Sequence, residues 1–341
     1  MPNISIIVPV YNREKDLPAL IESILSCADP RFELLLVNDG SKDNSLSVCQ
    51  EFAARDKRVQ VIDKENGGVS TARNAGIEQA KGKYLFFCDS DDLVVTETFA
   101  SALDLVETHD EDLLVFDFEY CFLNNGTTRK SSFVLPPDRP LSKEEIVSGM
   151  IEPLVCKEGT DLAGVWHKLF RADLVKSNHL RFEEKVARGE DWRFILDCLD
   201  AANSAFYIPS VLYIYKIDGS QVPSKYKRTP GIHLLGSIDR KLRLIEKYGI
   251  PISEEEKLRL RKSYIAEIAY AAAYDCPRQE LLSMMRSPLV QESIRILRAL
   301  PREQKNKIEF FRRGKLFSFC IKHNLVFPAR IAAKRWYKHK S

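Results

Sequence analysis

Short apolar runs alternate with segments of helical periodicity through the first 125 residues of this 341-residue chain, and this alternation constrains its fold more than any other feature. The apolar runs predict strands at residues 4–10, 32–39, 59–63, 83–89 and 113–123. Helical patterns lie between them, at residues 16–28, 45–56, 70–82 and 96–109. Strands that alternate with helices form right-handed crossovers, so the pattern predicts an α/β fold with a mainly parallel sheet flanked by helices.

The pattern changes after about residue 125. The turn sequence NNGTT at 124–128 predicts a hairpin, and residues 142–152 have helical spacing. From Pro230 onward the segments have helical spacing and are separated by proline or glycine. We therefore expect two domains, an α/β domain over residues 1–224 and a helical C-terminal domain over residues 225–341.

Residues 84–92 read YLFFCDSDD, an apolar run that ends in three carboxylates. We interpret it as a buried strand that carries Asp89, Asp91 and Asp92 at its carboxyl end. Three acids so close together repel one another unless a cation lies among them. Oxygen ligands favour Mg²⁺ or Mn²⁺, which also accept the oxygens of a diphosphate, so the cluster predicts a divalent cation and a nucleotide. The alternative, acids that cap the next helix, explains one acid more readily than three.

Polar residues follow three of the predicted strands. They are Tyr11 and Asn12 after the first strand, Asn38 and Asp39 at the end of the second, and Asp89 and Asp91 after the fourth. Ligands of open α/β sheets bind at the carboxyl ends of the strands, so we expect these side chains to converge on one rim. Each residue taken singly can also be a turn residue, because Asn and Asp are common in turns.

The composition, 45% hydrophobic and 29% charged, is that of an ordinary globular protein. Eight cysteines are scattered singly, which favours reduced core residues and a cytoplasmic location. Residues 302–341 hold 12 Lys and Arg against 2 acids, whereas residues 1–301 hold 39 against 46. Aromatic residues interleave with these basic ones, so we expect peripheral contact with the inner face of the cell membrane. The alternative is a helix whose apolar face packs on the body. Nucleic acid is a poorer partner for an acidic body.

The common phosphate-binding loops are not found where they would occur. The segment after the first strand, PVYNREKDL, contains no glycine, which excludes a GxGxxG loop there. The string GIEQAKGKY has one residue too many for a P-loop and precedes a strand. A nucleotide would therefore be held by side chains and a metal ion.

Six ordered motifs resemble those of the family 2 glycosyltransferases with the GT-A fold. They are SIIVPVYNRE, LLLVNDGSKDNS, NGGVSTARNAGI, YLFFCDSDD, VWHKLF and ARGEDW, and they span most of residues 3–220. The resemblance is to bacterial enzymes that build surface polysaccharides. It implies an inverting, Mg²⁺- or Mn²⁺-dependent transfer of a sugar from a nucleotide-diphosphate sugar, often UDP-linked, to a glycan or lipid-linked acceptor.

The resemblance also assigns residues to the donor. It places Pro9, Tyr11, Asp39 and Arg73 at the nucleotide. The chemistry agrees, because Asp39 can accept from the imide N–H of uracil and Tyr11 can stack on the ring. Arg73 can reach the base or the diphosphate, unless it is a surface arginine on its helix.

Within the acid cluster, the resemblance assigns Asp89 and Ser90 to the nucleotide sugar. Asp91 is the expected metal ligand, with Asp89 contacting the ribose or a metal-bound water. Asp92 is expected only to orient or cap.

The motif GED at 189–191 opens a helical pattern. Adjacent helical residues point about 100° apart, so Glu190 and Asp191 cannot both face one atom. The resemblance makes Asp191 the general base and Glu190 a supporting or acceptor-contacting group, whereas the alternative is plain helix capping by acids.

Trp166 and Lys168 match the spacing W-x-K-L of the family and are expected at the acceptor, although Trp166 can equally be a core residue. His167 stands where relatives commonly carry Asn. Lys216 and Ser220 are candidates for the diphosphate, with an edge strand and turn as the favoured alternative.

Two other functions fit the same residues. One is a nucleotide-sugar-binding protein of this fold without turnover, against which the intact DSDD and GED motifs argue. The other is a nucleotidyltransferase, which would release diphosphate instead of a nucleoside diphosphate.

Overall fold

The computed structural model describes residues 2–131, 133–156, 160–184, 189–218, 232–273 and 278–299. The chain divides into two compact units, Met1–Lys225 and Tyr226–Ser341. The expected domain boundary at residues 224–225 and the basic segment 302–341, with its expected membrane contact, lie outside the described residues.

The first unit contains a ten-stranded sheet in the order β3-β2-β1-β4-β9-β6-β10-β5, with β7 paired to β6 and β8 to β10. The strands are β1 (Ile4–Val10), β2 (Phe32–Asp39), β3 (Val59–Lys64), β4 (Tyr84–Phe87), β5 (Leu93–Val94), β6 (Leu113–Phe122), β7 (Thr127–Lys130), β8 (Pro140–Leu141), β9 (Lys168–Arg171) and β10 (Ala205–Ile217). β3, β2, β1 and β4 pair in parallel, as do β6 and β10, whereas β9 runs antiparallel between β4 and β6. The predicted α/β fold is confirmed, with an antiparallel strand inserted at the middle of the sheet.

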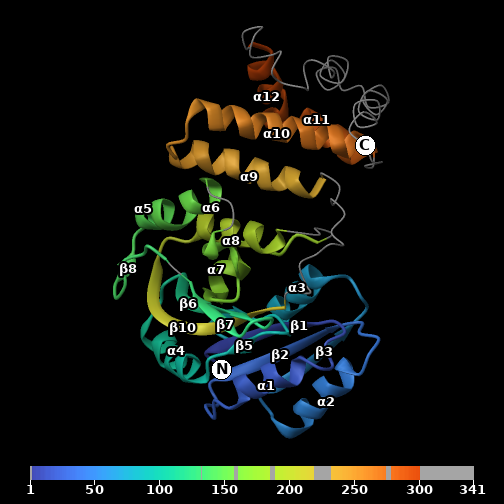
Figure 1. Ribbon diagram of the computed structural model, residues 1–341, viewed down its shortest axis with the longest axis vertical. Helices are drawn as coiled ribbons and strands as arrows, with labels where there is room; N and C mark the ends of the chain where they lie inside the picture. Colours follow the sequence, from blue (N-terminus) through green and yellow to red (C-terminus); the bar gives the residue numbers. More distant parts are fainter. Residues whose placement is uncertain are drawn as a thin grey trace. The chain divides into compact units, whose positions relative to one another are not determined.

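Helices cover both faces of this sheet. They are α1 (Leu17–Leu25), α2 (Ser45–Arg55), α3 (Val69–Gln79), α4 (Thr96–Thr108), α5 (Lys143–Ile146), α6 (Glu152–Cys156), α7 (Ala172–Ser177) and α8 (Glu190–Ala201), with a π turn at Val147–Ile151 and a 3₁₀ turn at Asp161–Ala163. Helices α1, α2 and α4 lie on one side of the sheet and α3, α7 and α8 on the other (Figure 1). A Cβ at Gly76 of α3 would lie 2.4 Å from the side chain of Ile7, so glycine allows α3 to approach β1 closely.

The core lies along the central parallel strands. Every residue of β1 and β2 is buried, which explains their largely apolar sequences. Val10 of β1 pairs with Asn38 of β2, and Ile7 pairs with Phe87 of β4. The residues that follow these three strands therefore share one edge of the sheet.

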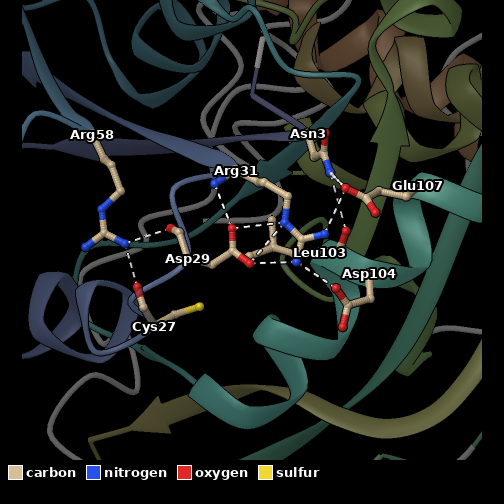
Figure 2. A network of polar contacts seen from close by, with 8 residues as sticks. All are labelled: Asn3, Cys27, Asp29, Arg31, Arg58, Leu103, Asp104 and Glu107. Carbon is tan, nitrogen blue, oxygen red and sulfur yellow. Dashed lines mark hydrogen bonds and ion pairs between the residues drawn. The ribbon is translucent and has the colours of Figure 1, made fainter.

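Two arginines organise the opposite, amino-terminal edge (Figure 2). Arg31 forms ion pairs with Asp29, with Asp104 at 2.6 Å and with Glu107 at 2.8 Å, and the last two acids belong to α4. Asn3 donates to the same Glu107 at 3.2 Å. These contacts fasten α4 to the beginning of the first two strands.

Arg58 binds the segment that connects α1 to β2. Its guanidinium donates to the carbonyl oxygens of Leu25 (3.3 Å), Cys27 (2.5 Å) and Asp29 (2.9 Å). Leu25 is the last residue of α1, so Arg58 pairs carbonyl groups that the helix itself leaves without a partner.

Arg58→Met is expected to lower the free energy of unfolding by about 1–3 kcal/mol, because it leaves these part-buried carbonyl oxygens without a donor. Arg55→Met is the matched control, since the ion pair that Arg55 makes within the described part of the chain is with the exposed Glu51. The control should cost less than about 0.5 kcal/mol. Urea unfolding followed by circular dichroism measures both, and equal losses in the two variants would contradict the role given to Arg58.

The described part of the second unit is helical, as the sequence predicts. It contains α9 (Ile232–Tyr248), α10 (Glu254–Ala273), α11 (Arg278–Arg286) and α12 (Pro288–Ala299), and no strand occurs within these described residues. Its buried side chains include Leu244 on α9, Ile265 and Ile268 on α10, and Ile294 on α12. Across all described residues, no helix is both long enough and apolar enough to cross a membrane.

Candidate active site

The turn after β4 places its three acids in three different environments. Asp89 Oδ1 lies 2.8 Å from Nη2 of Arg73, and Asp91 Oδ2 lies 3.2 Å from Nη2 of Arg13. Asp92 is 1% exposed and bonds to β10. Two arginines and a strand therefore relieve the repulsion among these acids. The sequence alone predicts a cation in that role.

Strand β10 holds Asp92 through both carboxyl oxygens. The hydroxyl of Tyr213 donates to Oδ2 at 2.7 Å, and the N–H of Lys216 donates to Oδ1 at 2.8 Å. The same Tyr213 hydroxyl accepts from the N–H of Asp89 at 2.9 Å. Burial, together with the nearby charge of Asp89, raises the pKa of Asp92 to about 8. Asp92 thus fixes the turn to β10, and Lys216 contributes its backbone.

Below about pH 4, where Asp92 is protonated in the folded and the unfolded state alike, Asp92→Asn is expected to have a free energy of unfolding close to that of the wild type, because both proteins then carry a neutral side chain of the same shape. Asp92→Ala should cost about 1–3 kcal/mol relative to Asp92→Asn, since the N–H of Lys216 loses its partner. The folded-state pKa of Asp92 is raised above the ordinary value of 3.8, so only the folded state keeps this proton between about pH 4 and 8. The stability of the wild type relative to Asp92→Asn should therefore fall as pH rises through that window. A pH series of urea unfolding measures it, and a difference that rises with pH would contradict the assignment.

Arg73 joins the acid turn to α8. Its side chain is 3% exposed; Nη2 lies 2.8 Å from Asp89, and Nη1 lies 2.5 Å from Oδ1 of Asp191. The guanidinium also lies 5.0 Å from the centre of the Phe182 ring. The two acidic motifs, about 100 residues apart in the sequence, are therefore bridged by one buried cation. The structure pairs Arg73 with these two acids, and its contact with the base or the diphosphate stays a prediction.

Asp191 is the second residue of α8, which follows Gly189 in a left-handed conformation with φ of 81°. Burial raises the pKa of Asp191 to about 7, although the charge of Arg73 lowers it and the charge of Glu190 raises it further. Glu190 lies 3.9 Å from Nη1 of Arg73 and does not share the shorter contact of Asp191. Both neighbouring acids therefore lie within ion-pair distance of the same nitrogen, with Asp191 closer, although their spacing on a helix predicts that they cannot both face one atom.

Asp39 accepts four hydrogen bonds from the end of β3 and from the loop that follows it. Oδ1 accepts from Lys64 Nζ at 2.6 Å and from the N–H of Gly67 at 2.9 Å. Oδ2 accepts from the N–H of Gly68 at 2.8 Å and from Asn66 Nδ2 at 3.2 Å. A carboxylate offers about four acceptor positions, so a bond from a uracil imide to Asp39 requires one of these donors to move. Asp39 orders this loop.

Tyr11 is the most accessible of the expected donor residues, with 43% of its surface exposed at the end of β1. Pro9 is buried within β1, where it pairs with Val37 of β2. Ser90 is 7% exposed in the acid turn. Tyr11 is therefore the residue here with a free surface on which a ring could stack.

The two expected acceptor residues are both buried. Trp166 is 8% exposed and stacks on Tyr213 and Tyr215, with ring centres 5.1 Å apart in both pairs. It is therefore a core residue, which is the alternative interpretation of the sequence. Lys168 Nζ bonds to the carbonyl oxygens of Leu162 and Gly164, both at 2.8 Å, and to Nε2 of His167 at 2.6 Å. These contacts use every hydrogen-bonding position of the amine, so Lys168 supports a turn and is not presented to an acceptor.

No group of three or more His, Cys, Asp or Glu side chains that could hold a metal ion occurs among the described residues. Mg²⁺ with a nucleotide needs fewer ligands, because one or two carboxylates, phosphate oxygens and waters complete its shell. Asp91 suits this chemistry: it is 30% exposed, and burial raises the pKa of its carboxyl despite the nearby Arg13. A further cation would stabilise its ionised form, so Asp91 and the neighbouring Asp89 are the residues that can hold one.

Known proteins resemble this chain over much of its length. A family model described as glycosyl transferase family 2 matches residues 5–176, about half of the chain. The chain belongs to glycosyl transferase family 2. The matched range of this glycosyltransferase includes the Asp89–Asp92 turn and ends before Asp191.

Relatives and a solved structure agree with this membership. The uncharacterised glycosyltransferase EpsJ of Bacillus subtilis is 30% identical over 262 residues, 76% of this chain and 74% of EpsJ. Poly(ribitol-phosphate) β-N-acetylglucosaminyltransferase TarS of Staphylococcus aureus is 27% identical over 232 residues, 66% of this chain and 38% of TarS. The crystal structure of TarS residues 1–349 with UDP-GlcNAc superimposes with a TM-score of 0.60 at 19% identity, covering 100% of this chain and 93% of that one. This likeness confirms the predicted fold.

Two residues at this site were not predicted from the sequence. Arg13 is part of the motif VYNRE, and its nearness to Asp91 could have been inferred only from the shared strand edge. Tyr213 lies 121 residues from its partner Asp92, and the alternation of the aromatic residues in β10 gives no sign of that contact.

Proposed function

We propose that this glycosyltransferase moves a sugar from a nucleotide-diphosphate sugar to a hydroxyl of a glycan or lipid-linked acceptor, with inversion at the anomeric carbon. The Arg73 bridge between Asp89 and Asp191 is the observation that supports this reaction most strongly. In a single displacement the base and the leaving group act on opposite sides of one carbon. The groups that hold them must therefore stay in fixed relation, which a buried guanidinium bonded to both provides.

In this reaction Asp191 removes the proton of the acceptor hydroxyl while that oxygen attacks the anomeric carbon. The new bond to the acceptor oxygen forms as the bond to the diphosphate breaks, and the nucleoside diphosphate leaves with the electron pair. A base works best when its pKa lies near the working pH, and burial raises the pKa of Asp191 to about 7. Glu190 supports Asp191 through its charge.

The donor is proposed to bind along the strand ends. Tyr11 stacks on the base, Asp39 keeps the loop beside it in place, and Asp89 with Ser90 faces the ribose and sugar. Asp91 would hold Mg²⁺ or Mn²⁺, which supplies positive charge for the departing diphosphate.

The substrate class is proposed from the named relative. TarS has been solved with UDP-GlcNAc, and its name specifies a poly(ribitol-phosphate) acceptor. For this chain we infer a UDP-linked hexose or N-acetylhexosamine as donor and a surface polymer or its lipid-linked precursor as acceptor. The expected cytoplasmic location and the expected membrane contact of residues 302–341 stay predictions.

A thermal-shift screen of UDP-, GDP- and dTDP-linked sugars, with and without Mn²⁺, tests the proposal. Ligands that bind the folded state raise the unfolding temperature, so UDP sugars should raise it, and more so with Mn²⁺. Absence of a shift with every nucleotide sugar in the presence of Mn²⁺ would contradict the proposed function.

A further inference from the structure

Arg13 occupies the carboxylate at which the cation is proposed to bind. Its Nη2 lies 3.2 Å from Oδ2 of Asp91, and the side chains are 38% and 30% exposed. The pair is therefore open to solvent and to a ligand, and its arginine is far more exposed than Arg73, which is 3% exposed. Neither the motifs nor the proposed reaction gives Arg13 a function.

The backbone of Arg13 is held in place from both sides. Its N–H donates to Oγ of Ser45 at 2.7 Å, and its carbonyl oxygen accepts from the N–H of Leu17 at 3.0 Å at the start of α1. The preceding Asn12 has a φ of 53° and accepts from the N–H of Lys42 at 2.7 Å. The main chain is thus anchored at the strand edge, and only the half-exposed side chain is free to change partner.

A guanidinium and a divalent cation compete for the same carboxylate. Both take an oxygen of Asp91, and their like charges repel each other at this distance. When a cation binds, Arg13 must leave Asp91 and needs another anion within reach of its anchored main chain. A nucleotide-diphosphate donor brings such an anion, because its diphosphate lies next to the cation that Asp91 holds.

We propose that Arg13 exchanges partners, neutralising Asp91 before the donor arrives and pairing with the donor diphosphate once the cation has bound. This inference rests on the proposed function. Arg13 then couples the binding of the two ligands. The cation alone binds weakly because it displaces Arg13 from Asp91, and it binds tightly with the nucleotide because Arg13 then pairs with the diphosphate. By linkage, the factor by which UDP tightens Mn²⁺ binding equals the factor by which Mn²⁺ tightens UDP binding.

The test is calorimetric titration of the full-length protein with Mn²⁺ and with UDP, separately and together. Arg13→Gln should bind Mn²⁺ alone about two- to fivefold more tightly than the wild type, which is the range expected for losing a half-exposed ion pair. The same variant should bind UDP in saturating Mn²⁺ about five- to twentyfold more weakly, because a charge-assisted bond to the diphosphate is lost. Arg13→Lys keeps the charge, so both of its affinities should lie between those of the wild type and those of Arg13→Gln. Arg55→Gln, which changes an exposed arginine on α2, should match the wild type.

The opposite directions of the two effects identify the exchange. Unchanged or weaker Mn²⁺ binding by Arg13→Gln overturns it, as does unchanged UDP binding in Mn²⁺, provided that thermal unfolding shows a folded variant. If Arg13→Gln does not fold, Arg13→Lys decides by the same criteria. Failure of the wild type to bind UDP and Mn²⁺ overturns the proposed function together with this inference, whereas normal wild-type binding with unaltered variants overturns this inference alone.

Discussion

Asp191→Asn is expected to lower the rate of sugar transfer by a factor on the order of 10² to 10⁴ while the donor still binds at nearly wild-type affinity. Asn has the shape of Asp but cannot take a proton from the acceptor hydroxyl. In the wild type, the same role predicts that kcat/KM falls about tenfold per pH unit below pH 7 and levels off above it, because the base must be ionised and burial raises the pKa of Asp191 to about 7. Initial rates and calorimetric donor binding measure the two halves of this prediction.

Glu190→Gln is the matched control, because it removes the same charge one residue away. Glu190 lies 3.9 Å from Arg73, beyond the 2.5 Å contact of Asp191, so the variant should keep most of its activity. The charge of Glu190 raises the pKa of Asp191, and its removal should therefore shift the pH profile to lower pH. A wild-type rate in Asp191→Asn, or an equal loss in Glu190→Gln, would show that Asp191 is not the base.

Arg73→Gln is expected to combine a loss of stability with a change in the pH profile. Removing one partner of a buried ion pair leaves its carboxylates uncompensated and costs on the order of 3–5 kcal/mol. The charge of Arg73 lowers the pKa of Asp191, so its loss should raise that pKa and move the rising limb of the profile to higher pH. At pH 7 the base would then be largely protonated, and kcat/KM should fall by a factor on the order of 10 or more. Urea unfolding and a pH series of initial rates measure these effects.

Arg73→Lys separates the charge of Arg73 from its geometry. A lysine retains the positive charge but has a compact ammonium that cannot bridge Asp89 and Asp191 as a planar guanidinium does. We expect its pH profile to lie nearer that of the wild type while its activity stays low. A destabilised Arg73→Gln variant with an unshifted pH profile would mean that Arg73 serves stability alone.

The fold was largely predictable because its central strands are predominantly apolar. β1 and β2 are buried throughout, and such runs between amphipathic helices have few other interpretations. β9 was missed because four residues that include Lys168 and Arg171 do not look like a central strand. Its lysine is tolerated there only because backbone carbonyl oxygens from a neighbouring turn accept its hydrogen bonds.

The roles of individual site residues were less predictable, since they depend on contacts between distant segments. The motif containing Arg73 gives no sign that its partner is Asp191, 118 residues later. Asp39 has the position expected of a base-binding residue, yet the loop at Asn66–Gly68 donates hydrogen bonds to both of its carboxylate oxygens. Local sequence identified which residues gather at the strand ends, whereas three-dimensional packing decides which of them pair with each other.

The central claim, an inverting transfer with Asp191 as base, is tested most directly by identifying both products of one turnover. The full-length protein is incubated with Mn²⁺, the UDP sugar that stabilises it most and a panel of surface-polymer acceptors, and the products are resolved by NMR. The account predicts one UDP released for each sugar transferred, an inverted anomeric configuration, and loss of both products in Asp191→Asn. Retained configuration, release of inorganic diphosphate, or unchanged turnover in Asp191→Asn would contradict it.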